Sequence, residues 1–226
     1  MTTALDDALD DIVAFALGRR RAARPLAAPG ERVGIGVIGV GRWGEILART
    51  FSGLREVEVA ALTVRDAARR AELQAGFPGA ALFGDAEALL SSPAVDAVVI
   101  ATPQDSHHAL ARRALERGKH VLVEKPFTRT AAQADELIAL ATAANRILMV
   151  DHTWLFEEGA RRLRALIAGG EHGTVVRYRG RIARPLASGG GGALAALGVH
   201  HVALLAALAG EAPVRVRAEA VLDGDG

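Results

Sequence analysis

The stretch 33–44 reads VGIGVIGVGRWG, and it decides the fold. It begins with a short apolar run, Val33–Ile38, that is typical of a buried strand. Glycines then punctuate the chain as they do in a tight turn. The next residues, 42–53, have the apolar spacing of a helix. A strand that passes through glycines into a helix predicts the first half of a βαβ unit.

The same alternation continues downstream. Apolar runs predict further strands, and amphipathic stretches between them predict helices. The expected strands are 57–63, 81–83, 95–101, 120–123 and 147–150, and the expected helices are 66–75, 86–91, 107–117 and 131–144. Continuous apolar strands fit a parallel sheet that is covered on both faces. We therefore predict a doubly wound α/β domain over residues 31–151.

The segments outside this domain have other patterns. Residues 1–30 predict an amphipathic helix, 5–21, and a linker that contains prolines. Residues 152–226 predict a partial α+β domain. Its expected elements are a helix at 157–168, a strand at 173–182, a glycine-rich loop at 188–192, a helix at 193–208 and a strand at 214–222.

Composition excludes several classes of function. The chain has 226 residues, a net charge of +1 and no cysteine. Disulfides, a thiolate nucleophile and cysteine-ligated zinc are therefore excluded. A balanced charge gives no general reason to bind nucleic acid, and the arginines near residues 19–24 read as a solvated helix end. The sequence shows neither a secretion signal nor an apolar stretch of about 20 residues, so we expect a cytoplasmic protein that binds no membrane.

The glycine pattern carries the first functional signal. Gly39-Val40-Gly41-Arg42-Trp43-Gly44 is a G-x-G-x-x-G motif between a strand and a helix, which is the context that a dinucleotide site requires. The first glycine permits the turn, the second lets a pyrophosphate approach the backbone, and the third lets the helix pack on the strand. The free N–H groups of the helix then face the phosphates. We expect a Rossmann domain that binds NAD(P).

The end of the second strand bears on the choice of cofactor. An NAD site usually has an acidic residue there, but this chain reads Thr63-Val64-Arg65-Asp66. Arg65 has the charge to pair with a 2′-phosphate, whereas Asp66 is expected to cap the next helix. The pattern favours NADP(H) over NAD(H).

Two further stretches resemble a known family. Residues 101–108 read ATPQDSHH, and residues 114–126 read ALERGKHVLVEKP. With the glycine loop at its spacing, and with GGAL at 191–194, this combination resembles the Gfo/Idh/MocA family (glucose–fructose oxidoreductase, inositol dehydrogenase, MocA). The resemblance runs from about residue 32 to residue 220. It implies a two-domain, NAD(P)-dependent oxidoreductase of sugars, polyols and related carbonyl compounds.

The resemblance also implies roles for individual residues. Lys125 would contact the substrate and the nicotinamide ribose and help to move the proton, with a cis bond to Pro126 and Glu124 orienting it. A lysine suits this task because partial burial lowers its pKa. Thr102 and Pro103 would face the nicotinamide half of the cofactor. His107 begins the following helix, where a contact with the cofactor and a capping or packing role are both open.

The second domain would supply the rest of the site. His152 and Trp154 would line a substrate pocket or pack in the core. The family's motif G-G-x-L-x-D-x-G-x-H has an Asp and a His that take part in catalysis. This chain keeps the histidine as His200 but has Ala196 at the aspartate position. His201, next in the chain, is expected to point elsewhere.

Two hypotheses therefore stay open. The chain is an oxidoreductase in which Lys125 and His200 handle the proton. Alternatively, it is a catalytically impaired dinucleotide-binding protein, such as a sensor, a partner subunit or a truncated remnant. Members of the family are usually longer, with a second domain that commonly forms the subunit interface. A homo-oligomer, or a partner subunit that completes the domain, is expected in either case.

Overall fold

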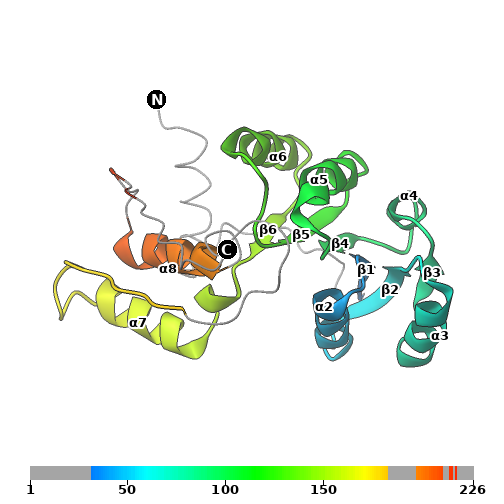
Figure 1. Cartoon of the computed structure of the whole chain (residues 1–226), viewed down its shortest axis with the longest axis horizontal. Helices are drawn as coiled ribbons and strands as arrows, with labels where there is room; N and C mark the ends of the chain where they lie inside the picture. Colours follow the sequence, from blue (N-terminus) through cyan, green and yellow to red (C-terminus); the bar gives the residue numbers. More distant parts are fainter. Residues whose placement is uncertain (1–31, 183–196, 211–213, 216, 218–226) are drawn as a thin grey trace, which may run out of the picture.

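Six strands form one parallel sheet in the computed structural model, which describes residues 32–182, 197–210, 214, 215 and 217 (Figure 1). The strands are β1 (Val33–Ile38), β2 (Val57–Thr63), β3 (Ala81–Phe83), β4 (Ala97–Ile100), β5 (His120–Glu124) and β6 (Leu148–Asp151). Their order is β3-β2-β1-β4-β5-β6, so the winding reverses between β1 and β4. Doubly wound sheets bind ligands at the carboxyl ends of the strands that flank this reversal. The predicted Rossmann-like α/β fold is confirmed.

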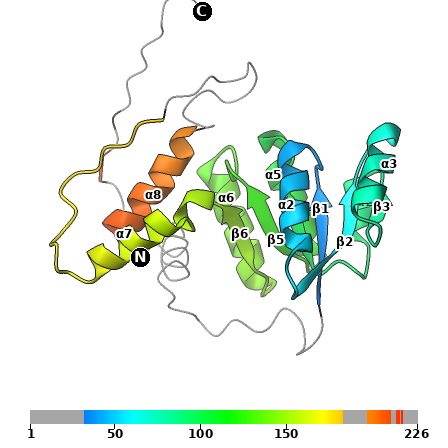
Figure 2. The same cartoon turned by 90° about the horizontal axis from the view of Figure 1, so that it is seen from below.

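Helices cover both faces of the sheet. α2 (Arg42–Ser52) and α3 (Ala67–Gly76) lie on one face; α4 (Ala86–Leu90), α5 (His107–Glu116) and α6 (Ala131–Ala143) lie on the other (Figures 1 and 2). Two short 3-10 helices, η1 (Gln104–Ser106) and η2 (Thr153–Leu155), follow β4 and β6. Beyond η2, α7 (Glu158–Ala168) and α8 (Val199–Ala209) form a pair in which α8 packs against both α7 and η2.

The central strands β1 and β4 bury side chains on both faces of the sheet, because side chains alternate along a strand. Val33, Ile35 and Val37 of β1 belong to the cluster beneath α2 and α3. Ile38 and Ile100 belong to the cluster beneath α4, α5 and α6. The two clusters explain why the strands read as continuous apolar runs rather than as alternating ones.

One predicted strand is absent. Residues 173–182, expected as a strand from their alternation, are irregular. The physical reason is that a strand needs a neighbouring strand for its backbone hydrogen bonds, and no strand in the described part of the chain pairs with this segment. Within the second domain, α7 and α8 agree with their predicted helices over the described residues.

Several predictions concern residues outside the described ranges. They are the N-terminal helix at 5–21, the linker, the glycine-rich loop at 188–192 and most of the strand at 214–222. Ala196 also lies there. Of the helices that are described, none has the length and apolar character needed to cross a membrane.

Candidate functional site

The glycine loop joins β1 to α2 at the reversal of the sheet. Gly39 has a φ of +91°, a conformation that residues with a Cβ rarely adopt. A Cβ there would also lie 2.6 Å from Cγ2 of Thr102. A Cβ on Gly44 would lie 2.2 Å from the carbonyl oxygen of Gly39. Both glycines are therefore explained by the folding of the protein itself.

Gly41 has no such explanation. A Cβ on this residue would meet nothing within 4 Å, and its φ is negative. Gly41 is also the N-cap of α2 and makes no side-chain cap, so the first N–H groups of the helix lie open to a ligand. An anion is the group that such a helix end favours. The space above Gly41 fits the pyrophosphate of a dinucleotide.

Two side chains next to the glycine loop are exposed to solvent. Arg42 and Trp43 are exposed on the first turn of α2, with Trp43 57% exposed. The hydroxyl oxygen of Thr63, at the end of β2, accepts a hydrogen bond from the backbone N–H of Gly39 at 3.1 Å. This bond fixes the loop against the neighbouring strand, and it is a contact that the sequence analysis missed.

Arg65 and Asp66 follow β2 and have different fates. Asp66 caps α3 by accepting a hydrogen bond from the backbone N–H of Arg69 at 2.9 Å, which confirms its predicted role. Arg65 is exposed, and the described residues place no carboxylate in an ion pair with it. Its guanidinium is therefore available for an anionic ligand.

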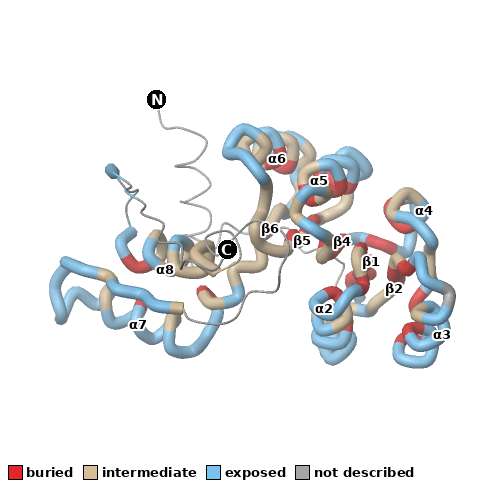
Figure 3. The backbone as a smooth tube through the Cα atoms, viewed as in Figure 1, coloured by how far each residue is buried: buried red, intermediate tan, exposed pale blue. Residues whose placement is uncertain are grey.

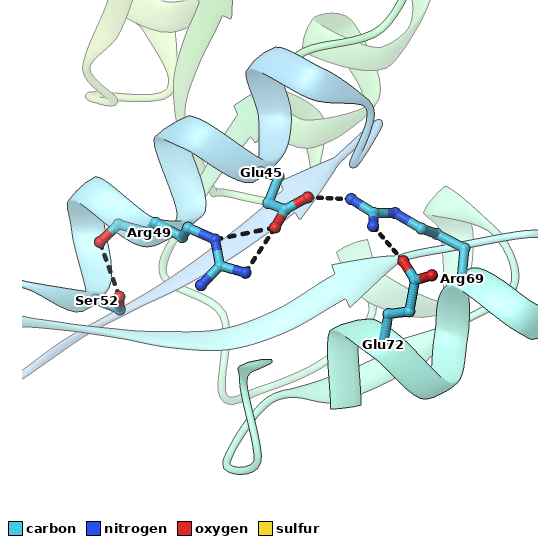
Figure 4. A network of polar contacts seen from close by, with 5 residues as sticks. All are labelled: Glu45, Arg49, Ser52, Arg69 and Glu72. Atoms are coloured by element: carbon cyan, nitrogen blue, oxygen red, sulfur yellow. Dashed lines mark hydrogen bonds and ion pairs between the residues drawn. The ribbon is translucent and has the colours of Figure 1, made fainter. Parts of the chain in front are cut away.

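A polar network joins α2 to α3 (Figure 4). Glu45 of α2 accepts from Arg49 at 2.7 Å and also pairs with Arg69 of α3, which in turn pairs with Glu72. The two arginines hold the pKa of Glu45 below its ordinary value. Because carboxylates compensate the charge of Arg69, Arg65 is the better candidate for binding a phosphate.

The turn after β4 brings Thr102, Pro103 and His107 to the same edge. Thr102 lies beside Gly39, as the clearance of that glycine shows. Pro103 is exposed at the start of η1. His107 is only 1% exposed, and its ring lies within hydrogen-bond distance of two backbone carbonyls. His107 is therefore too buried to contact a cofactor directly, and it acts on one only by holding the loops that it contacts.

Glu124 ends β5 beside Asp151, which ends β6, and Lys125 directly follows Glu124. The Lys125–Pro126 peptide bond is cis, in agreement with the implication of the resemblance. The strand register sets Glu124 opposite Asp151, and their side chains share a hydrogen bond. Burial, then repulsion by Asp151, raises the pKa of Glu124 to about 7, against a smaller opposite effect of Lys125. The site therefore holds a carboxyl that titrates near neutral pH.

Two histidines of α8 contact one aromatic ring of η2. Trp154 of η2 stacks on His200 of α8, with ring centroids 4.7 Å apart and an angle of 18°. His201 meets the same indole edge-on at 5.4 Å, and its Nδ1 lies 2.6 Å from the hydroxyl of Tyr178. The expectation that His201 points elsewhere is wrong, because consecutive helix residues can still contact one ring as large as tryptophan.

His152 lies between the strand ends and this aromatic group. Burial, and next the nearby His200, lower the pKa of His152, whereas Asp151 acts in the opposite direction. Its Nδ1 is buried without a hydrogen-bond partner in the described part of the chain. Titratable side chains thus run from Lys125 through Glu124, Asp151 and His152 to His200. Among the described residues, no cluster of three acidic or histidine side chains is placed to hold a metal.

The pairing of Glu124 with Asp151 was predictable from the sequence. Glu124 and Asp151 each come directly after an apolar strand, and the two strands are consecutive. Adjacent parallel strands end at the same edge, so the two carboxyls were predictable neighbours. Tyr178 had no such signal, because it lies in the segment that was expected to be a strand.

Comparisons with known proteins agree with this geometry. Residues 33–152 match the model of an oxidoreductase family with an NAD-binding Rossmann fold, and residues 160–225 match that of a GFO/IDH/MocA C-terminal domain. A 1-carboxy-3-chloro-3,4-dihydroxycyclohexa-1,5-diene dehydrogenase of Comamonas testosteroni is 38% identical over 141 residues, which cover 62% of this chain and 36% of that protein.

Two other relatives are a 3-reductase and a 3-ketoreductase. A dTDP-3,4-didehydro-2,6-dideoxy-α-D-glucose 3-reductase of Saccharopolyspora spinosa is 33% identical over 186 residues, which cover 74% of this chain and 53% of that protein. A 3-ketoreductase from Actinomadura kijaniata, solved with NADP and TDP-benzene, has a TM-score of 0.58 and 30% identity, covering 62% of this chain and 43% of that one. The matched parts thus amount to between about a third and a half of the relatives' lengths.

Proposed function

The chain belongs to the Gfo/Idh/MocA oxidoreductase family, and from that premise we propose that it functions as an NAD(P)-dependent oxidoreductase. Its substrate would be a sugar, a polyol or a related carbonyl compound. The nicotinamide, when bound, accepts or donates the hydride. The protein's part is to bind both reactants, to orient them and to move the proton. In this assignment, residues 1–30 precede a cofactor domain over 31–151, and residues 152–226 belong to a substrate domain.

The open space above Gly41 is the observation that carries this proposal. Packing accounts for the glycines at 39 and 44, but no atom of the described protein needs position 41 to be a glycine. A bound group that approaches the backbone supplies the missing reason. The exposed start of α2 then provides donors for its phosphates.

Each strand end contributes one task. Thr102 and Pro103, after β4, support the nicotinamide half of the cofactor. Lys125, after β5, donates a proton to the substrate oxygen during reduction and accepts it during oxidation, with Glu124 beside it. His200 is the second candidate for proton transfer, and Trp154 and His152 form the wall next to it.

We further propose a preference for NADP(H). Arg65 is exposed at the end of β2, and the acidic residue next to it is engaged as a helix cap. One solved relative was crystallised with NADP. A guanidinium pairs well with a phosphate because several of its N–H donors can bind the oxygens together.

A titration with NADPH and NADH, followed by fluorescence and by thermal stability, tests the proposal. A ligand at 100 times its Kd should stabilise the fold by about 2.7 kcal/mol. Gly41→Ala should bind at least about tenfold more weakly because the methyl group occupies the pyrophosphate space. Gly79→Ala is the matched control. Its Cβ also meets open space, but Gly79 lies just before the amino end of β3, away from the carboxyl ends of the strands. Arg65→Ser should weaken NADPH binding more than NADH binding.

The outcomes separate the possibilities. Equal binding by the two glycine variants would contradict the placement of the pyrophosphate. A folded protein that binds neither dinucleotide would contradict the proposed function as a whole. Unchanged selectivity in Arg65→Ser would remove only the NADP(H) preference.

An impaired dinucleotide-binding protein is the second candidate, and Ala196 favours it. Without the carboxylate that the family motif has at this position, proton transfer has one group fewer. Turnover with a panel of sugars and polyols distinguishes the two, since the impaired protein binds a dinucleotide without oxidising or reducing anything. Gain of activity in Ala196→Asp would identify the missing carboxylate as the cause.

We also propose that a further protein surface covers α7 and α8, from a second copy of the chain or from a completing subunit. Leu163, Leu166, Val202 and Leu205 are all at least 39% exposed on these two helices. Light scattering of the purified protein tests this, and a monomer at micromolar concentration would contradict the first form.

A further inference from the structure

His107 joins the two loops that carry the proposed chemistry. Its Nδ1 lies 2.9 Å from the carbonyl oxygen of Pro126, directly after Lys125, and its Nε2 lies 2.8 Å from the carbonyl oxygen of Thr102. The ring is 1% exposed, so water competes for neither contact. A neutral imidazole donates through one of its nitrogens and an imidazolium donates through both. In either state the ring fills the space between the β4 turn and the β5 turn.

A second brace connects the same two segments. The side-chain amide of Gln104 donates to the carbonyl oxygen of Thr128 at 2.8 Å. Thr102 and Ser106 also share a hydroxyl–hydroxyl hydrogen bond of 2.6 Å within the first turn. Side chains from the start of α5 and from η1 therefore hold the backbone that directly follows the cis Lys125–Pro126 bond.

The position of these braces matters for catalysis. Thr102 and Pro103 stand where the nicotinamide is proposed to lie, and Lys125 where the proton is proposed to move. Hydride transfer and proton transfer act on the same substrate group, so the spacing between the two loops sets the geometry of both. An error of about 1 Å in such a spacing costs about a hundredfold in rate.

We propose that His107 is a positioning residue, whose ring nitrogens hold the Lys125–Pro126 turn at a fixed distance from the Thr102–Pro103 turn. The inference rests on the proposed function for its consequence, but the brace itself is independent of it. A residue that only filled the core would act through its volume, and one that positions the loops acts through its two nitrogens.

Substitutions of comparable size separate volume from hydrogen bonding. His107→Phe keeps a ring and loses both nitrogens. His107→Asn keeps a donor near the place of Nδ1, on the Pro126 side, and His107→Gln keeps one near the place of Nε2, on the Thr102 side. His108→Phe is the matched control, because His108 is the next residue of α5 but its Nε2 contacts Glu136 of α6, 2.9 Å away.

The first readout is amide hydrogen exchange at Phe127 and Thr128, which requires no ligand. We expect exchange there to be at least about tenfold faster in His107→Phe, because a lost hydrogen bond of ordinary strength permits local opening. His107→Asn should restore most of the protection on this side and His107→Gln much less. Exchange in His108→Phe should match the wild type. Unchanged exchange in a folded His107→Phe variant would overturn the inference.

The second readout is the Kd for NADPH and the division of the rate between kcat and KM. We expect His107→Phe to lower kcat by at least about tenfold while the KM of the sugar substrate changes less, because the turn that carries Lys125 is displaced during the reaction. Normal binding and turnover in this variant, beside faster exchange, would overturn the functional part. If the wild type binds no dinucleotide, the proposed function fails, and the exchange data still decide whether the brace exists.

Discussion

The sheet and the α7–α8 pair differ in how much of their apolar surface they bury. The sheet has one buried cluster under each face, whereas residues 153–210 contribute only Leu155, Arg164 and Leu208 to the buried residues described (Figure 3). α8 is apolar on almost every side, a composition typical of helices that are fully enclosed. The sheet thus supplies its own core, while the helix pair presents a surface suited to a further partner.

The largest effect should come from the core of the sheet. Leu62→Ala removes a fully buried side chain of β2 and leaves a cavity, so we expect a loss of about 2–5 kcal/mol in the free energy of unfolding. Val202→Ala trims a side chain of α8 that is 63% exposed and should cost less than about 1 kcal/mol. Urea unfolding measures both. Similar losses in the two variants would contradict the difference in burial between the sheet and the α7–α8 pair.

The junction of the two regions should make stability depend on pH. The raised pKa of Glu124 means that the folded protein keeps a proton which the unfolded chain releases between about pH 4.5 and 7. Stability is therefore lost as the pH rises through this window. Glu124→Gln removes this dependence, and we expect the variant to gain about 1–2 kcal/mol on the wild type between pH 5 and pH 8, allowing for solvent screening.

His152 provides an internal check on that measurement. Its pKa is lowered, so stability that depends on its neutral form is lost as the pH falls below the ordinary histidine value. The two groups therefore act in opposite directions, and only the fall toward alkaline pH should disappear in Glu124→Gln. Glu58→Gln, which changes an exposed carboxylate of β2, serves as the control. Parallel pH profiles for all three proteins would contradict the Glu124 assignment.

A smaller effect, opposite in sign to a core mutation, is expected in α7. Arg164 is 7% exposed, burial lowers its pKa, and its Nε has no partner among the described residues. Arg164→Met keeps the apolar length of the side chain and removes the unpartnered polar group. The free energy of unfolding should stay within about 1 kcal/mol of the wild type or rise. A loss as large as that of Leu62→Ala would show that the guanidinium has a partner in the assembled protein.

The smallest effect should come from the network of Glu45, Arg49, Arg69 and Glu72. Arg49 and Glu72 are exposed and Glu45 and Arg69 are partly exposed, and ion pairs near the surface are screened by salt. Glu45→Gln should lower the Tm slightly in low salt, and the difference should vanish at high ionic strength. A difference that persists in 1 M salt would mean that the link between α2 and α3 is a structural part of the cofactor domain.

Local pattern predicted the sheet domain well because its central strands, β1 and β4, are buried on both faces. Val33–Ile38, Val57–Thr63 and Ala81–Phe83 have the predicted bounds, and the remaining strands shift by only a few residues at their ends. The segment 173–182 failed because alternation alone does not supply a hydrogen-bonded neighbour. The segment has the alternating pattern of a strand, but none of the described strands pairs with it.

The site was predictable where backbone geometry decides it. At Gly39 and Gly44 a Cβ would collide with neighbouring atoms, as the motif predicts, and Asp66 caps α3. Side-chain partners were not predictable in the same way. His107 contacts the carbonyl of Pro126 as well as that of the nearby Thr102, and Trp154 contacts two histidines of α8. Pro126 and both histidines are distant in sequence from the side chains that they contact. Such contacts depend on how the loops and helices pack rather than on local pattern.

The clearances in the glycine loop also restrict how this protein can evolve. A substitution at Gly39 or Gly44 collides with the backbone before it can alter any ligand. Lineages that drift toward a different dinucleotide must therefore change residues that the fold leaves free, such as the exposed Arg65 and Trp43. Directed evolution of cofactor choice has its most productive library at those two positions.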